Sequence, residues 1–195
     1  NDLDGSELNL NKFKNKVIVV VNVASQCGFT KQYEDMQKVW DNYRDKGVVM
    51  IGVPSNDFGK QEPGTSEEIK NFCEAKFGIT FPMTAKVSVK GENAHPFYIW
   101  ARENHGKSTI PKWNFHKIII GKDGKVLDTF ASLTNPSSKK FIKAIEKATL
   151  NNDYREKISN LKSPYGDSSA PQKVVEAIES VDINDRKWYV KQKLC

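Results

Sequence analysis

An apolar run followed by a cysteine constrains most strongly what this chain folds into. Val17–Val21 form an unbroken, mostly β-branched run, which predicts a strand buried on both faces, as in the middle of an α/β sheet. Small and polar residues follow, and then Cys27-Gly28. From Tyr33 onward, apolar side chains recur every three or four residues, which indicates a helix. Cys27 is therefore expected at a strand-to-helix turn.

This position favours chemistry at Cys27. Open α/β sheets bind their ligands at the carboxyl ends of the strands, and a helix start stabilises an anion such as a thiolate. Most free cysteines are instead small buried hydrophobes. The neighbours of Cys27 are polar and glycine-rich, however, and we therefore interpret it as a reactive thiol.

Length and charge set broad limits on the protein. A chain of 195 residues with 38% hydrophobic residues is sufficient for one domain with a real core. The net charge is +6, but the basic residues are scattered among 24 acidic ones. This pattern is typical of a solvated surface, and no nucleic-acid partner is expected.

The cysteines and histidines give no sign of a metal site or cofactor. The three cysteines, Cys27, Cys73 and Cys195, lie far apart, without a CxxC pair or a Cys/His pair at zinc spacing. An odd and sparse set argues against a disulfide-stapled secreted domain. The three histidines also lack ligand spacing, and we expect them to be surface or packing residues: His95, His105 and His116.

The expected location is cytoplasmic. No apolar run approaches the roughly 18 residues that a membrane helix requires, so no integral membrane segment is expected. The first residue is Asn1 rather than Met, so a trimmed leader would make an exported or organellar form the alternative.

The rest of the chain predicts alternating helices and strands in a three-layer α/β domain at residues 1–150. A helix at 30–45 and a strand at Val48–Val53 complete a parallel βαβ unit. Asp4-Gly5 suggests a short β-ribbon before the first strand. A helix is expected at 65–77, with Thr65 and Glu68 as a capping box and Gly78 as its C-cap. The further elements expected are a short strand at 86–89, a helix at 94–103, a hairpin of strands at 118–120 and 125–130, and a helix from Asn135.

Residues 151–195 differ in character from the rest of the chain. They contain the breaker-rich run SPYGDSSAP and one short amphipathic stretch, Val174–Ile178. We interpret them as a C-terminal appendage of unknown role, in which Cys195 is a terminal thiol without function.

Three separated loops carry polar side chains: NVASQCGFT, SNDFGKQEPG and PKWNF. With these motifs in this order, residues 3–150 resemble the glutathione peroxidase family, in its cysteine-type, thioredoxin-dependent (phospholipid-hydroperoxide-like) subgroup. The resemblance implies a thioredoxin-like fold, with a central mixed β-sheet flanked by α-helices. It also implies the site residues, with Cys27 as the peroxidatic cysteine, Gln61, Trp113 and Asn114 as the other active-site positions, and Cys73 as the resolving cysteine.

The chain departs from the family pattern at two places. The family usually has Cys-Asn-Gln-Phe-Gly where this chain has Ser55-Asn56-Asp57-Phe58-Gly59, but that cysteine is not the resolving one. The chain also lacks the longer insertion near WNF that tetrameric members use for assembly. The resemblance therefore implies a monomer or small homo-oligomer.

Elementary thiol chemistry supports the same roles. Lowering a thiol pKa from ~8.5 by ~2.5 units raises the thiolate fraction roughly 30-fold, but weakens each thiolate roughly 10- to 18-fold as a nucleophile. Fast peroxide reduction therefore needs groups that stabilise charge on the departing oxygen. The carboxamides of Gln61 and Asn114 and the indole of Trp113 donate hydrogen bonds and stay neutral.

The function expected is a thiol peroxidase for hydrogen peroxide and for organic or lipid hydroperoxides. Cys27 would become a sulfenic acid, Cys73 would condense with it to a disulfide, and thioredoxin (or glutathione) would reduce the enzyme again. Because Cys73 lies in a predicted helix, local unwinding of about 66–80 is expected before bonding. A peroxide sensor or redox relay is the alternative. A general thiol–disulfide oxidoreductase is disfavoured, since CGFT lacks a second cysteine.

Overall fold

The computed structural model describes residues 1–160, with side chains through residue 150. Most of the predicted appendage, including Val174–Ile178 and Cys195, lies outside the described residues. Asn1–Asp153 form one compact unit. The last helix, α4 (Lys139–Asn160), crosses residue 150, which the sequence suggested as the domain end.

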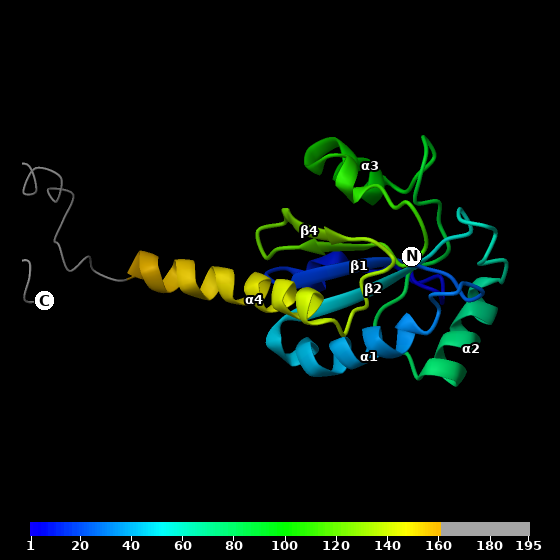
Figure 1. The fold of residues 1–195 in the computed structure, drawn as a ribbon, viewed down its shortest axis with the longest axis horizontal. Helices are drawn as coiled ribbons and strands as arrows, with labels where there is room; N and C mark the ends of the chain where they lie inside the picture. Colours follow the sequence, from blue (N-terminus) through cyan, green and yellow to red (C-terminus); the bar gives the residue numbers. More distant parts are fainter. Residues whose placement is uncertain (161–195) are drawn as a thin grey trace, which may run out of the picture. The chain divides into compact units, whose positions relative to one another are not determined.

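A mixed sheet of four strands lies at the centre of this unit (Figure 1). The strands are β1 (Val17–Val23), β2 (Val48–Pro54), β3 (Lys117–Ile120) and β4 (Val126–Phe130), in the order β2-β1-β3-β4. β1 pairs in parallel with β2 and antiparallel with β3, and β3 pairs antiparallel with β4. β1 has a neighbour on each side and packed cores on both faces, so its apolar run is buried except for the half-buried Ile18, as the sequence predicts.

Helices cover both faces of the sheet. Val19 and Val21 of β1 pack into one core, which also takes side chains from α1 (Gln32–Tyr43), α2 (Ser66–Phe77) and α4. Val20 points the opposite way, into a second core that includes α3 (Pro96–His105). Figure 1 shows α1 and α4 on one side of the sheet and α3 on the other. The three-layer α/β arrangement is therefore confirmed.

Helix α2 has the predicted ends. Thr65 Oγ1 accepts a hydrogen bond from the Glu68 amide at 3.2 Å, and Glu68 Oε2 accepts one from the Thr65 amide at 2.7 Å. Gly78 ends the helix in the left-handed region, with φ of 60°. Both ends of this helix are thus determined by local hydrogen bonding.

The strand predicted at 86–89 is wrong. Its amides bond elsewhere: Val87 N donates to Pro54 O at 3.0 Å, and Val89 N donates to the Asp57 carboxylate at 2.6 Å. The segment therefore follows an irregular path, with isolated bridges from Met83 and Thr84 rather than a strand.

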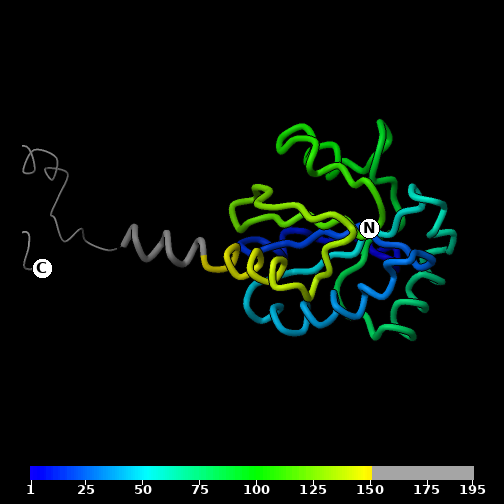
Figure 2. Tube along the Cα trace, viewed as in Figure 1, coloured from blue at the N-terminus to red at the C-terminus, as the bar shows by residue number. Residues whose placement is uncertain are grey.

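Two other boundaries also differ from the prediction. The Asp4-Gly5 turn forms, but the Asp2 carboxylate accepts hydrogen bonds from the amides of Asp4 and Ser6. A short 3-10 helix, Leu10–Phe13, then forms instead of a ribbon. The N-terminus instead lies beside the segment after α2, where Ala85 N donates to Asn1 O at 2.9 Å (Figure 2). Helix α4 begins at Lys139, because Asn135 caps a separate turn through Ser137 N.

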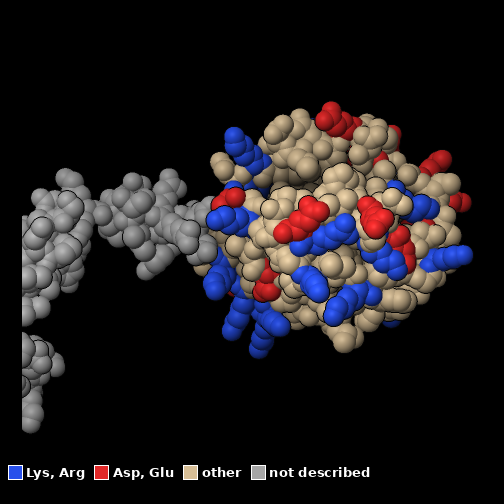
Figure 3. Space-filling view, turned by 90° about the horizontal axis from the view of Figure 1, so that it is seen from above, with Lys and Arg blue, Asp and Glu red and all other residues tan. Residues whose placement is uncertain are grey.

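Charge is mixed over the surface. On the face shown in Figure 3, Lys and Arg side chains are interspersed with Asp and Glu rather than forming a stripe of one sign. Among the helices of residues 1–160, none is both long enough and apolar enough to cross a bilayer.

Candidate active site

Cys27 lies in a closed turn at the carboxyl end of β1. Thr30 holds the turn: its Oγ1 accepts from Cys27 N at 3.0 Å and donates to Ala24 O at 2.9 Å. The Phe29 amide points at Cys27 Sγ, 3.5 Å away. The half-buried thiol therefore faces a backbone donor that suits a thiolate.

The loop after β2 lies directly against this turn. Gln26 N donates to Gln61 O at 3.0 Å, and Ser25 Oγ donates to Glu62 Oε1 at 2.5 Å. Gly59 gives the loop its bend, with φ of +62°, and a Cβ there would lie 3.4 Å from the Gln61 side chain. The loop thus depends on glycine to bring Gln61 beside the Cys27 turn.

The buried carboxamide side chain of Asn22, on β1, holds the PKWNF loop in place. Asn22 Nδ2 donates to Trp113 O at 3.1 Å, and Asn22 Oδ1 accepts from His116 N at 3.1 Å. The backbone oxygen of Asn22 accepts from Phe115 N at 2.6 Å. Asn22 thereby connects the strand that leads to Cys27 with the WNF loop. Sequence reasoning missed this residue, although a polar side chain in the run VIVVVNV was a signal.

The structure links two of the predicted site residues, Asn114 and Gln61, by a direct hydrogen bond. Asn114 Nδ2 donates to Gln61 Oε1 at 3.0 Å, so the amide nitrogen of Gln61 is left to donate elsewhere. Asn114 is wholly buried. The ring of Trp113 is 40% exposed and lies 5.7 Å from that of Phe58, so it forms part of the open surface beside the site.

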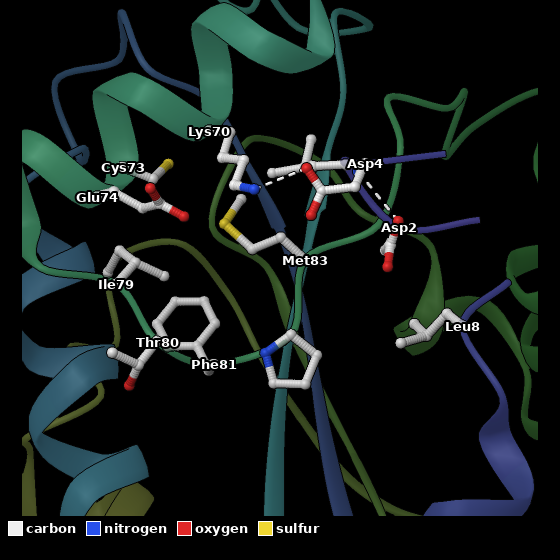
Figure 4. A pocket seen from close by; sticks show the side chains of 12 residues that line it. Asp2, Asp4, Leu8, Lys70, Cys73, Glu74, Ile79, Thr80, Phe81 and Met83 are labelled. Carbon is white, nitrogen blue, oxygen red and sulfur yellow. Dashed lines mark hydrogen bonds and ion pairs between the residues drawn. The ribbon is translucent and has the colours of Figure 1, made fainter. Parts of the chain in front are cut away.

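Cys73 lies apart from this group, in α2. It is 1% exposed, and both it and Cys27 are free thiols. Burial raises the pKa of Cys73 to about 11, opposed by the neighbouring Tyr33 hydroxyl. On the α2 side it lines a cavity of about 350 Å³, across which Lys70 bridges to Asp4 at 2.7 Å (Figure 4).

Glu62 is a second residue that sequence reasoning missed. Its side chain is wholly buried, and burial raises the pKa of its carboxyl despite the hydrogen bond from Ser25 and the nearby Lys86. Its place in QEPG, next to Gln61, was the available signal. A buried carboxyl without a salt bridge is uncommon and marks a site of interest.

The chain is similar to known proteins over more than half of its length. The family model of glutathione peroxidase matches residues 1–102. The hydroperoxy fatty acid reductase gpx1 of Synechocystis sp. is 44% identical over 144 residues, which are 70% of this chain and 85% of that protein. The glutathione peroxidase-like peroxiredoxin 2 of Saccharomyces cerevisiae is 44% identical over 141 residues, 70% of this chain and 86% of that protein.

Solved structures show the same fold. The crystal structure of Trgpx in apo form superposes with a TM-score of 0.59 and 36% identity, covering 76% of this chain and 91% of that one. A thioredoxin-family thiol:disulfide interchange protein from Chlorobium tepidum TLS has a TM-score of 0.57 at 19% identity, over 76% of this chain and 90% of that one, and shows the fold alone. The thioredoxin-like fold is thus confirmed, and the chain belongs to the glutathione peroxidase family.

Proposed function

We propose that this member of the family is a thiol peroxidase in which Cys27 reduces hydrogen peroxide and organic or lipid hydroperoxides. One observation carries the assignment to these residues. The Asn114–Gln61 hydrogen bond orients a neutral amide donor on a loop that is itself bonded to Gln26, the residue before Cys27. The names of the relatives, a hydroperoxy fatty acid reductase and a peroxiredoxin, support the substrate class.

In the first step, the Cys27 thiolate attacks one peroxide oxygen and the O–O bond breaks. Cys27 becomes a sulfenic acid, and the departing oxygen takes a proton to leave as water or an alcohol. The amide of Gln61 and the indole of Trp113 stabilise the charge on that oxygen. The Phe29 amide stabilises the thiolate before attack.

In the second step, the Cys73 thiol condenses with the sulfenic acid to give a Cys27–Cys73 disulfide and water. Cys73 is buried in intact α2, so local unwinding of that helix brings its Cα to the ~4.4–6.8 Å that a disulfide requires. Thioredoxin, or glutathione in its place, then reduces the disulfide. The name of the yeast relative, a peroxiredoxin, is consistent with this cycle.

The experiment is peroxide consumption coupled to thioredoxin and its reductase, for the wild type, Cys27→Ser and Cys73→Ser. We expect both variants to lose turnover, while Cys73→Ser still consumes one equivalent of peroxide. Normal turnover of Cys73→Ser with glutathione would show that Cys73 is structural. An inactive wild type with both reductants would contradict the proposal.

The proposal also includes the domain bounds, the oligomeric state and the location of the enzyme. The peroxidase domain is residues 1–150, with 151–195 as an appendage, and the protein is a monomer or small homo-oligomer. A cytoplasmic location fits, because the cycle needs a pool of reduced thioredoxin. A sensor or relay role is not favoured, since the relatives are named as a reductase and as peroxiredoxins.

A further inference from the structure

The Asp57 carboxylate connects the loop after β2 to a distant part of the chain. Its Oδ2 accepts three hydrogen bonds, from Ser88 Oγ at 2.9 Å, from Val89 N at 2.6 Å and from Lys90 N at 3.2 Å. The three donors lie in a segment that is neither helix nor strand. Hydrogen bonds to a charged acceptor are stronger than neutral ones, so these three bonds, the Asp57 clamp, hold the loop against residues 88–90.

The clamp is built from the two residues at which the chain departs from the family pattern. The family usually has Cys and Gln where this chain has Ser55 and Asp57. Ser55 is wholly buried, and its Oγ accepts a hydrogen bond from Asp57 N at 3.3 Å. A Gln at position 57 would offer one neutral oxygen on a longer side chain. The family resemblance therefore assigns no role to this pair.

Phe58 connects the clamp to the active site. It follows Asp57 in the chain, is 4% exposed, and packs in the same core as Val89. Lys90 Nζ lies 4.6 Å from the centre of the Phe58 ring, within the range of a cation–π contact. The centre of the Trp113 ring lies 5.7 Å from that of Phe58. The clamped segment thus supports Phe58, and Phe58 supports the indole of Trp113.

The indole of Trp113 needs support of this kind. Asn22 Nδ2 donates to Trp113 O at 3.1 Å, which fixes the backbone but leaves the side-chain torsions free. The side chain is 40% exposed, and Phe58 is the buried ring against which the indole packs. A donor stabilises developing charge best when its orientation is set before the reaction.

We propose that Asp57 is a positioning residue for Trp113. By holding residues 88–90 it fixes Phe58, and Phe58 in turn fixes the direction in which the indole N–H donates to the departing peroxide oxygen. The inference rests on the proposed function and deepens its first step. Asp57 contacts neither the peroxide nor Cys27 in this scheme, and none of the relatives' names assigns it a role.

Other bonds should confine the effect of Asp57 to Trp113. Lys86 Nζ donates to Gly64 O at 2.7 Å, which attaches the same distant segment to the loop beyond Gln61. The hydrogen bond that orients the Gln61 side chain also lies outside the clamp. Removing the Asp57 carboxylate should therefore free Trp113 and leave Gln61 in place.

The test compares Asp57→Ala in three backgrounds: wild type, Trp113→Phe and Gln61→Ala. Each protein is mixed with hydrogen peroxide, and the rate constant for Cys27 oxidation is taken from peroxide loss in a single turnover. Asp123→Ala is the matched control, because Asp123 Oδ1 also accepts a hydrogen bond from a backbone amide, at 3.1 Å, in the β3–β4 hairpin. Urea unfolding checks that each variant is folded.

We expect Asp57→Ala to slow Cys27 oxidation about tenfold, since small displacements of a positioned group strongly weaken its effect. Trp113→Phe should slow it about 100-fold, because a donor is lost. Asp57→Ala should then cost less than about twofold in Trp113→Phe, but the full factor of about ten in Gln61→Ala. Asp123→Ala should leave the rate unchanged.

Asp57→Asn is the conservative variant. It keeps a neutral acceptor for the three donors and should slow the reaction about threefold. It carries the same comparison should Asp57→Ala not fold.

Fluorescence quenching by acrylamide gives a readout that does not depend on turnover. The difference in emission between each protein and its Trp113→Phe form reports Trp113 alone. Acrylamide should quench this difference more readily in Asp57→Ala than in wild type or Asp123→Ala, because the indole has lost its support.

Two results would overturn the inference alone. One is a wild-type rate in Asp57→Ala while Trp113→Phe is slow. The other is an equal loss from Asp57→Ala with and without the Trp113 indole, which would make Asp57 a general support of the loop. A wild-type rate in Trp113→Phe would contradict the role of Trp113 in the proposed function, and the inference with it.

Discussion

At the residue scale, the candidate site depends on buried carboxamides that join separate parts of the chain. Asn22 and Asn114 are 1% and 0% exposed, and each donates through Nδ2 to a group from another loop. A carboxamide offers both donors and an acceptor without a charge. Such residues can therefore hold loops together in the interior without the desolvation cost of an ion.

Asn114→Ala tests whether the orientation of Gln61 matters. Without the donor at 3.0 Å, the Gln61 amide can rotate and present its oxygen to the departing peroxide oxygen. We expect the rate constant for Cys27 oxidation to fall about 10- to 100-fold, measured by stopped-flow with hydrogen peroxide. Asn104→Ala, which removes a similar side-chain bond on α3, is the control. Equal rates in the two variants would refute the role of Asn114.

Asn22→Ala tests the connection between β1 and the WNF loop. The change leaves Trp113 O without its side-chain donor and His116 N without its acceptor. Leaving such buried groups unpaired should lower the free energy of unfolding by about 2–4 kcal/mol, measured in urea. Asn22→Asp keeps an acceptor for His116 N and tests the donor separately. A loss below about 1 kcal/mol would show that water replaces the lost bonds.

At the element scale, α2 begins with a stabilising capping box, yet the proposed cycle requires its Cys73 to leave the packed core. The capping box and the left-handed Gly78 stabilise the helix at both ends. Cys73 lies in the packed core beneath it. The stability of α2 and the rate of disulfide formation should therefore be linked, because the helix has to open before the sulfurs meet.

Thr65→Ala is expected to change these two properties in opposite directions. Losing an N-cap costs a helix about 1 kcal/mol. If opening of α2 limits the reaction, disulfide formation after one equivalent of peroxide should accelerate about fivefold. His95→Ala, which removes the cap of α3, controls for general destabilisation. An unchanged rate in Thr65→Ala would show that α2 does not open at this end.

At the scale of the whole molecule, two adjacent basic residues are buried where β3 begins. Lys117 Nζ donates to Gln32 Oε1 and to Thr134 O, each at 2.6 Å, and so connects α1 to the segment before α4. Burial lowers its pKa to about 7. Burial, with Lys117 next to it, also lowers the pKa of His116 to about 4. The folded state therefore resists protonation at both residues.

The stability of the protein should fall in mild acid because of His116. An unfolded histidine has a pKa near ~6.5, so between pH 6.5 and 4 the unfolded state binds a proton that the folded state does not. Stability from this residue is present above about pH 6.5 and is lost as the pH falls toward 4. Wild type should lose about 2–3 kcal/mol more than His116→Gln between pH 7 and 4.5, measured by urea unfolding. Equal losses would refute this assignment.

Local patterns were sufficient where hydrophobic periodicity or a capping box decides the element. The β-branched run Val17–Val21 predicted the central strand, and Thr65 with Glu68 predicted the capping box. The failures occurred where a side chain bonded to the backbone in place of the predicted element. The Asp2 carboxylate and the Asn135 side chain did so over two to four positions. The amide of Val89 bonds to Asp57, 32 positions away, so the strand predicted there does not form.

The sequence by itself determined the four strands that form, the main helices and the strand-to-helix turn at Cys27, because hydrophobic periodicity and capping act over a few residues. Only the tertiary structure decided which polar side chains meet. The Asn22 side chain accepts from the backbone amide of His116 across 94 positions, and the Ser25 side chain donates to the side chain of Glu62 across 37. Burial, which depends on the complete packing of the domain, raises the pKa of both Cys73 and Glu62. Desolvation is a property of the folded interior, and no local pattern of residues records it.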